Sequence, residues 1–178
     1  KPVVILPGFP TSAVFTFHEF LAPVIRAYAG LPPHQREHLD ATLPMRINSE
    51  RGRTEYLLVG LVPTEGGLSA YPMGKGSGSV TTFSGADGFI TIGQHTEILD
   101  AGAQVQVQLL GKGLDPADLI LIGSHCVGLD WLAGELIRGG TRIKTMSVGS
   151  TGGLMAAKGG ECDIAGIHLM DPATGVYN

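Results

Sequence analysis

Residues 103–110, "AQVQVQLL", alternate polar and apolar side chains with a period of two. Val105, Val107 and Leu109 fall on one side of an extended chain, and three glutamines fall on the other. This alternation is typical of a β-strand that has one face in a hydrophobic core and one in water. The segment therefore predicts a strand of an antiparallel sheet.

The period of two extends over the whole middle of the chain. Residues 43–48, "LPMRIN", and 54–62, "TEYLLVGLV", also have the pattern of strands, and "TEGG" at 64–67 has that of a turn. Turn glycines and a second strand pair follow within 70–92. Short strands at this spacing favour a small all-β sandwich or half-barrel, which we assign to residues 33–112.

A different pattern precedes this region. Residues 4–17, "VILPGFPTSAVFTF", have the order strand, tight turn, helix, and the continuous apolar run at 3–6 predicts a buried strand. Pro23 is expected to kink the helix or to begin it again after a break. We assign residues 1–32 to the C-terminal end of an α/β domain, and expect that sequence upstream of Lys1 has been cut away.

The last third of the chain alternates apolar strands with helices. Such an order at this length predicts a βαβαβ half of a parallel sheet, which we assign to residues 113–178. The predicted strands lie within 118–126, 143–150 and 162–170, and the predicted helices within 128–140 and 151–160.

Two turns of this unit carry hydroxyl groups. Ser124 lies in "GSHCVG" and Ser150 and Thr151 lie in "GSTGG", each directly after a predicted parallel strand. The carboxyl ends of adjacent parallel strands meet at one edge, where hydroxyls, backbone N–H groups and helix N-termini can bind a small oxyanion. The same hydroxyls also fit helix caps, which is the commoner role.

Two other segments are candidates for phosphate contacts. Lys75, Ser77 and Ser79 lie in the glycine-rich stretch "YPMGKGSGS", but its spacing is not that of a P-loop, and the spacing alone favours a flexible turn without a ligand. Arg53, in "RGR", suits a bidentate phosphate contact, although exposed arginines are usually only solvated.

Composition excludes several function classes. The net charge of −4 and the absence of a basic stripe argue against a nucleic-acid partner. No apolar run reaches the roughly twenty residues that a membrane span needs. The two cysteines have no CxxC spacing, which disfavours a zinc site. Two separated cysteines fit a reducing, cytoplasmic compartment. One of them, Cys126, precedes a predicted helix, where a thiol is either activated or packed and inert.

These motifs together resemble a known family. Residues 6–25, "LPGFPTSAVFTFHEFLAPVI", are similar to the "PGNPVSA" motif of the molybdopterin molybdenumtransferases, the MoeA/gephyrin molybdenum insertases. The order GR-x-EY, GSGS, ADG and AG-x-x-V-x-V over 52–107 resembles the C-terminal β domain of that family. Residues 115–178 resemble the periplasmic-binding-protein-like module that is fused behind such enzymes.

The resemblance implies an activity for the full-length protein. Enzymes of this family insert molybdenum from molybdate into adenylylated molybdopterin, with Mg²⁺ assisting, in a cleft between two subunits of a homodimer. Phe9 departs from the motif, where the family usually has Asn, and the family's acidic catalytic residues lie upstream of Lys1. The chain alone is therefore expected to be inactive. The resemblance places at the cleft Pro7, Gly8, Pro10, Arg53, Lys75, Ser77 and Ser79.

An alternative belongs to another function class. Ser124, Ser150 and Thr151 occupy the places at which oxyanion receptors similar to the fused module grip a tetrahedral anion. The protein would then be a non-catalytic molybdate or oxyanion sensor that uses the β domain as a dimerisation scaffold. A third possibility is that the fused module has only a structural role.

Overall fold

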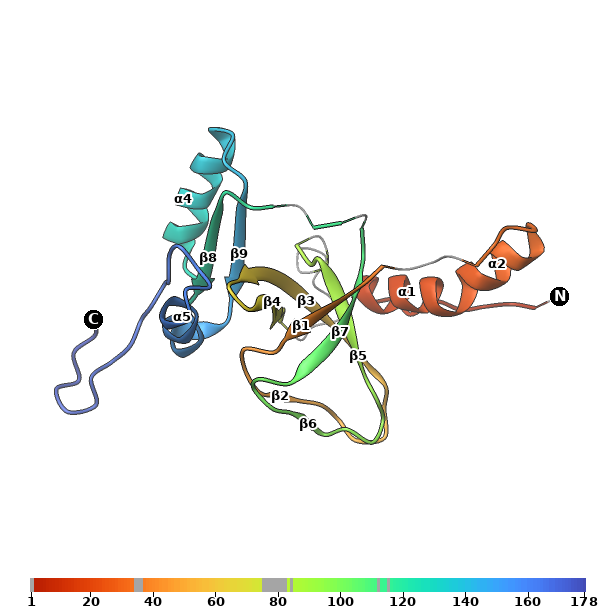
Figure 1. The fold of residues 1–178 in the computed structure, drawn as a ribbon, viewed down its shortest axis with the longest axis horizontal. Coiled ribbons are helices and arrows are strands. Elements are labelled where there is room, and N and C mark those ends of the chain that lie inside the picture. Colours follow the sequence, from red (N-terminus) through yellow and green to blue (C-terminus); the bar gives the residue numbers. More distant parts are fainter. Residues whose placement is uncertain (1, 34–36, 75–82, 84, 112, 115) are drawn as a thin grey trace.

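The computed structural model describes the chain except for residues 1, 34–36, 75–82, 84, 112 and 115. It has three parts: an N-terminal helical segment, a β-barrel and an α/β unit. Figure 1 shows the barrel in the middle, with the helical segment on one side and the α/β unit on the other. Among the described residues, no helix is both long enough and apolar enough to cross a membrane.

The barrel has five strands in the order β1-β4-β3-β5-β7. Strand β1 closes it, because it pairs antiparallel with β7 along its whole length and parallel with β4 at Thr42 and Ser69. The all-β prediction is thus confirmed, while the sheet is a closed barrel and not a sandwich or half-barrel. The barrel strands are β1 (His38–Thr42), β3 (Glu55–Thr64), β4 (Gly67–Pro72), β5 (Gly88–Ile92) and β7 (Gln104–Leu109); β2 (Ile47–Asn48) and β6 (Ile98–Leu99) form a separate ribbon.

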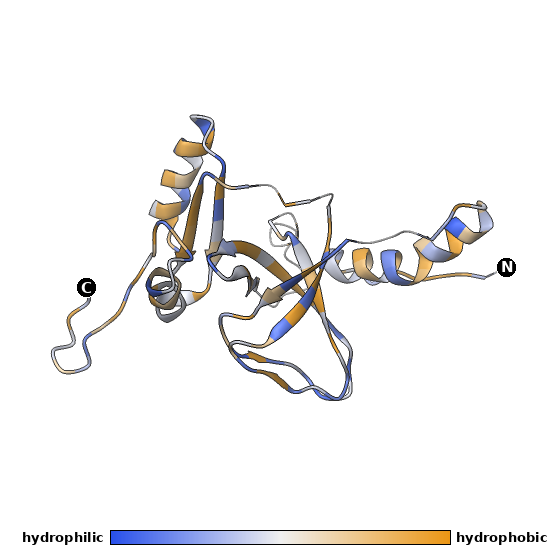
Figure 2. Cartoon of the chain, in the orientation of Figure 1, coloured by the Kyte–Doolittle hydropathy of each residue, from blue (hydrophilic) through white to orange (hydrophobic). Residues whose placement is uncertain are grey.

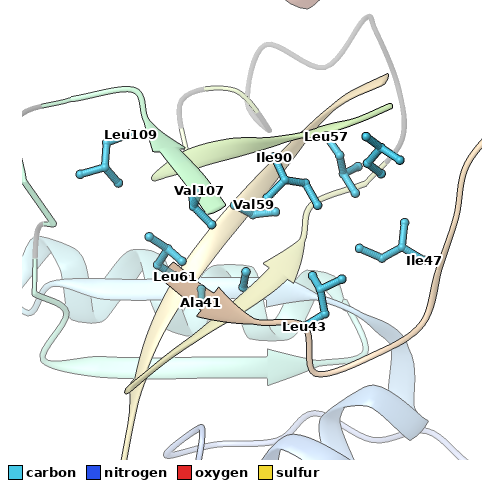
Figure 3. Close-up of a cluster of buried hydrophobic side chains, with 11 residues drawn as sticks. Ala41, Leu43, Ile47, Leu57, Val59, Leu61, Ile90, Val107 and Leu109 are labelled. Carbon is cyan, nitrogen blue, oxygen red and sulfur yellow. The ribbon is translucent and has the colours of Figure 1, made fainter. Parts of the chain in front are cut away.

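Alternating side chains of the strands fill the barrel interior (Figure 3). In β7, Val107 and Leu109 are buried and Val105 packs against the same cluster, as the alternation predicts. The buried cluster comprises Ala41, Leu43, Ile47, Leu57, Val59, Leu61, Ala70, Ile90, Ile92, Val107 and Leu109.

Strand β3 is buried on both faces. Its odd-numbered residues Leu57, Val59 and Leu61 point into the barrel core. Its outward residues are buried as well: Leu58 lies in a cluster with the N-terminal helix, and Val62 in a cluster with the α/β unit. The continuous apolar run "YLLVGLV" therefore has a direct cause, since different parts of the chain cover the two ends of the outer face.

The N-terminal segment contains α1 (Pro10–Thr16), a π-helical turn η1 (Phe17–Leu21) and α2 (Ala22–Tyr28). Pro23 lies in the first turn of α2, and the wider π-turn, with the Ala22 N–H donating to the Phe17 carbonyl, accommodates the break. The strand predicted at residues 3–6 is wrong. That segment is exposed and pairs with no described strand.

The α/β unit contains β8 (Leu119–Gly123), α4 (Val127–Arg138), β9 (Ile143–Ser147) and α5 (Gly149–Lys158). β8 and β9 are parallel over five residue pairs, as predicted. The predicted third strand is reduced to one parallel bridge between Leu121 and Ile164. One reason is that the Asp163 side chain, and not a backbone carbonyl, accepts the hydrogen bond from the Ile120 N–H.

The N-terminal helices and α4 contain many hydrophobic residues (Figure 2), and several of these side chains are exposed. On the N-terminal segment these include Phe17, Phe20 and Ile25, and on α4 they include Val127 and Trp131. Most of the apolar surface of the strands, in contrast, is buried. The stable core of the molecule therefore lies in the barrel and at its contacts with the two flanking parts.

Candidate functional site

A cleft of about 470 Å³ lies between α1 and the adjoining ends of β3 and β4. α1 begins at Pro10, which suits the first helical position because its missing N–H would have no helical partner there. The helix then presents hydroxyl groups and aromatic rings to the barrel. The cleft is lined by Thr11, Ser12, Phe15, Thr16, Phe20, Arg53, Thr54, Glu55, Tyr56, Leu57, Leu58, Met73 and Gly74.

Aromatic packing holds α1 in place. Phe15 is the buried residue of this helix, and its ring stacks on Tyr56 with centroids 5.2 Å apart. It also meets Phe89 edge to face at 4.9 Å and Phe83 at 6.2 Å. Such aromatic pairs add to the stabilisation from buried area. One residue of the helix thus fixes the wall of the cleft against the barrel.

The polar groups of the cleft are unevenly satisfied. The Thr11 hydroxyl oxygen is buried and has no hydrogen-bond partner among the described residues, and a buried polar atom in this state favours a ligand or water that would complete it. Arg53 pairs with Glu50 at 3.1 Å, but both side chains are more than three-quarters exposed. Such a surface pair contributes little stability, so a phosphate group can replace Glu50 as the partner of the guanidinium.

Of the residues that the resemblance assigns to the substrate cleft, Arg53 lines the cavity beside α1. Pro7, Gly8 and Pro10 are exposed at the start of α1 and do not line it, whereas the next residues, Thr11 and Ser12, do. The predicted contacts Lys75, Ser77 and Ser79 lie outside the described residues, which reach the cleft edge at Gly74.

Sequence reasoning missed the cleft residues Thr11, Phe15 and Tyr56. A signal for the first two was available, because they are four positions apart and therefore share one face of a helix. Tyr56 lies in the GR-x-EY motif and faces outward from β3, where it meets Phe15. The partnership between Phe15 and Tyr56 becomes evident only once the helix is known to pack on this strand.

The two predicted oxyanion turns lie at one sheet edge. β8 and β9 end side by side at Gly123 and Ser147. Some of the polar groups there are already used within the chain: the Ser150 hydroxyl accepts a hydrogen bond from the His168 N–H at 2.8 Å and donates to the carbonyl of the same residue at 3.3 Å. The Ser124 N–H donates to the Gly166 carbonyl at 2.7 Å.

Thr151 lies in a different setting from Ser150. It lines a cavity of about 320 Å³ between α5 and the barrel, together with Tyr71 and Glu161. Burial, and then the neighbouring Glu161 carboxylate, raise the pKa of the Tyr71 phenol above its ordinary value. Both oxyanion-turn hydroxyls of "GSTGG" therefore lie near the start of α5, but they face different partners.

Cys126 is exposed, so the packed interpretation of this cysteine is wrong. Its sulfur accepts a hydrogen bond from the Leu129 N–H at 3.3 Å and so caps α4. Within the described part of the chain, no three His, Cys, Asp or Glu side chains gather in a way that could hold a metal ion.

The cleft and the α/β unit meet opposite ends of the same strands. The cleft involves Leu57 and Leu58 of β3, whereas the Lys144 side chain of the α/β unit reaches the Leu61 carbonyl. Four residues of strand separate Leu57 from Leu61, which is about 13 Å at the usual rise. The cleft and the Lys144 contact therefore lie on different parts of β3.

Two protein families match separate segments of the chain. Residues 40–110 match the MoeA C-terminal region (domain IV), and residues 133–178 match the PBP superfamily domain. The first segment includes all five barrel strands except the start of β1, and the second begins within α4. The first match thus falls on the barrel and the second on the α/β unit, and the resemblance stated for both segments is confirmed.

Two curated proteins have sequences similar to part of this chain. Molybdopterin molybdenumtransferase 2 of Mycobacterium tuberculosis, from strains CDC 1551 and H37Rv, is 32% identical over 106 residues. The match covers 60% of this chain and 26% of the relative, so the chain spans about a quarter of the curated relatives that it matches.

Solved structures of molybdopterin biosynthesis proteins are also similar. The MoeA protein of Pyrococcus horikoshii is 36% identical with a TM-score of 0.48, over 61% of this chain and 26% of that protein. A molybdenum cofactor biosynthesis protein of Pyrococcus furiosus is 24% identical with a TM-score of 0.48, over 57% and 36% of the two chains.

Proposed function

We propose that this chain contributes the C-terminal region of a molybdenum insertase, which transfers molybdenum from molybdate to adenylylated molybdopterin. The observation that carries the proposal is the match of residues 40–110 to the MoeA C-terminal region, in a chain whose Arg53 lines a cleft. The two free cysteines fit a cytoplasmic protein of this kind.

The role that we propose for this chain is to bind and orient substrate. Arg53 is the bidentate donor for a phosphate group, and Thr11 and Ser12 add hydroxyl hydrogen bonds from α1. The rings of Phe15 and Tyr56 give the cleft a rigid apolar wall against which a planar heterocycle packs. None of these groups is an acid or base for the transfer itself, so the chain alone is expected to lack insertase activity.

The described cleft residues do not fit a magnesium site. Mg²⁺ prefers an octahedral set of oxygen ligands. Glu55 is the carboxylate of this cleft, and its side chain already accepts a hydrogen bond from the Ser49 hydroxyl at 2.7 Å. We therefore assign no step to Mg²⁺ at these residues. In the homodimer that we propose, groups for the metal would come from outside this cleft.

A titration of the purified chain tests this role. Isothermal titration with adenylylated molybdopterin should show binding, and Arg53→Met should weaken it at least tenfold because one charged hydrogen-bonding partner of the phosphate is lost. Arg51→Met is the matched control: it removes the same charge two residues away, at a side chain that pairs with Glu97 and does not line the cleft. Equal affinities of the Arg53→Met variant and the unsubstituted chain would refute the assignment.

A second function, oxyanion sensing by the α/β unit, is favoured by the side-by-side turns after β8 and β9. Binding there needs the Ser150 hydroxyl to leave the His168 backbone. Thermal melting with molybdate, tungstate, sulfate and phosphate tests it, because a ligand of the native state raises apparent stability. A molybdate-selective shift that disappears in Ser124→Ala with Ser150→Ala would support sensing, and no shift with any of these anions would contradict it.

A further inference from the structure

The barrel and the α/β unit share a hydrophobic layer. Val62 and Tyr71 on the outer face of the barrel form one buried cluster with Ile122, Met146 and Ala156 of the α/β unit; Met45, Ile120, Val148 and Cys162 pack around this cluster. Gly60, the outward position between Leu58 and Val62, permits this close approach. A Cβ atom there would lie 2.8 Å from the Met146 sulfur.

A buried ion pair covers the edge of β3 at this contact. The last residue pair between β3 and β5 is Val59 and Gly88. β5 therefore does not reach Leu61, whose backbone N–H and carbonyl point toward the same edge of β3. Side chains take the place of a strand: the Asp87 carboxylate accepts the Leu61 N–H at 2.6 Å, and the Lys144 ammonium donates to the Leu61 carbonyl at 2.8 Å. Lys144 and Asp87 also pair with each other at 2.5 Å, and their side chains are only 15% and 13% exposed.

A second polar contact lies at the end of α5. Glu161 follows this helix, and its N–H donates to the Ala156 carbonyl at 2.9 Å. The carboxylate of Glu161 accepts hydrogen bonds from two side chains of β4, the Ser69 hydroxyl at 2.6 Å and the Tyr71 phenol. Both oxygens of this carboxylate therefore accept hydrogen bonds from barrel side chains that lie about ninety residues earlier in the chain.

From these contacts we infer that the barrel is the docking platform of the α/β unit, and that the two form one rigid, cooperatively folded body. We call the five side chains Ser69, Tyr71, Asp87, Lys144 and Glu161 the clasp. Units joined within a chain usually move relative to each other unless their interface is large and apolar. Here any hinge motion would leave a carboxylate buried without its cation and uncover the backbone edge of β3.

The inference has a mechanical consequence that is independent of the proposed insertase role. β8, β9 and α5 keep a fixed position on the barrel, so the turns that carry Ser124 and Ser150 do not swing toward it or away from it. If ligand binding makes the α/β unit close, the segment from β8 to α5 is not the part that moves. The cavity that Thr151, Tyr71 and Glu161 line likewise stays at this interface.

Hydrogen exchange of the full chain under increasing urea tests the inference. The slowest amides of β3 and those of β8 should exchange through the same opening reaction, with the same urea dependence. Lys144→Met should speed exchange in β8 by more than tenfold. The matched control is Lys158→Met, which removes the same charge from an exposed position of α5. A milder pair, Tyr71→Phe and Glu161→Gln, alone and together, measures the coupling of the second contact.

Each outcome is decisive. In Lys144→Met, faster exchange in β8 alone would mean that the α/β unit has lost its docking to the barrel. Faster exchange in both β8 and β3 would mean that the two parts lose stability together. Either result supports the clasp. The inference is overturned if β8 and β3 open independently in the unsubstituted chain. It is also overturned if Lys144→Met and Lys158→Met have equal effects. Should Lys144→Met fail to fold, additive effects of the milder pair would overturn it, and a non-additive effect would support it.

Discussion

Replacing Phe15 by alanine should release the N-terminal helix from the barrel. Phe15 is 8% exposed and is the buried residue of α1, while η1 and α2 contribute none. Removing a buried phenylalanine costs about 3–5 kcal/mol, and this ring makes the aromatic contacts of α1 with Tyr56 and Phe89 of the barrel. A loss of about 3 kcal/mol corresponds to roughly a hundredfold increase in the opening of the helix.

Hydrogen exchange can distinguish release of the helix from global unfolding. Amides of α1 such as that of Ala13 should exchange about a hundredfold faster in Phe15→Ala, whereas amides in the middle of β3 should change little, because the barrel core does not contain Phe15. Phe20→Ala is the matched control, since its ring is 65% exposed and its loss should cost below about 0.5 kcal/mol. Equal acceleration in the two variants would refute the claim that Phe15 anchors the helix.

Four further substitutions follow from the contacts. Tyr71→Phe should reduce the loss of stability that occurs above about pH 10. The native Tyr71 phenol has a raised pKa and keeps a proton that the unfolded chain releases, so the stability that it contributes is complete below that pH and falls as pH rises. Urea midpoints of both proteins at pH 9 and 11 measure the difference. Gly153→Ala should destabilise by about 1–3 kcal/mol, because its Cβ would lie 2.9 Å from the Ile122 carbonyl, whereas Gly134→Ala on α4, whose Cβ would make only an ordinary van der Waals contact with the Arg138 guanidinium at 3.9 Å, should stabilise by about 0.5–1 kcal/mol; urea unfolding measures both. Gly88→Ala should lower the urea midpoint as well, because its Cβ would lie 2.6 Å from a carbonyl of the neighbouring strand β7.

The strands were predictable because their pattern is local. The alternation in "AQVQVQLL" follows from one buried and one wet face, and β7 has that arrangement. The continuous apolar run in β3 likewise reflects burial of both faces. The helix ends at Gly139 and Gly140 follow from backbone chemistry that needs no knowledge of the rest of the fold.

Features that depend on distant contacts were not predictable in this way. Barrel closure needs the parallel bridge between Thr42 and Ser69, which no local period encodes. The apolar run at residues 3–6 predicts a strand, yet a strand forms only where a partner lies beside it, and no described strand does. The contact between Glu161 and Tyr71 joins segments ninety positions apart.

The candidate site, too, was predictable from the sequence only in part. The family resemblance assigns Arg53 to a substrate cleft, which stays a prediction; in the structure Arg53 lines the cavity beside α1. The motif residue Pro10 shapes the start of α1 without lining the cleft. Thr11 and Phe15 line it because the helix packs on β3, which depends on the fold as a whole. Ser150 was predicted from its turn, but its hydroxyl bonds to a backbone segment whose position the turn does not reveal.

The central claim is that the cleft between α1 and β3 binds the substrate of a molybdenum insertase. The most direct measurement is a hydrogen-exchange footprint of the chain with and without adenylylated molybdopterin. The account predicts slower exchange over α1 and at residues 53–58, with no change at the turns that carry Ser124 and Ser150. Protection confined to those turns, or no protection at any position under saturating ligand, would contradict it.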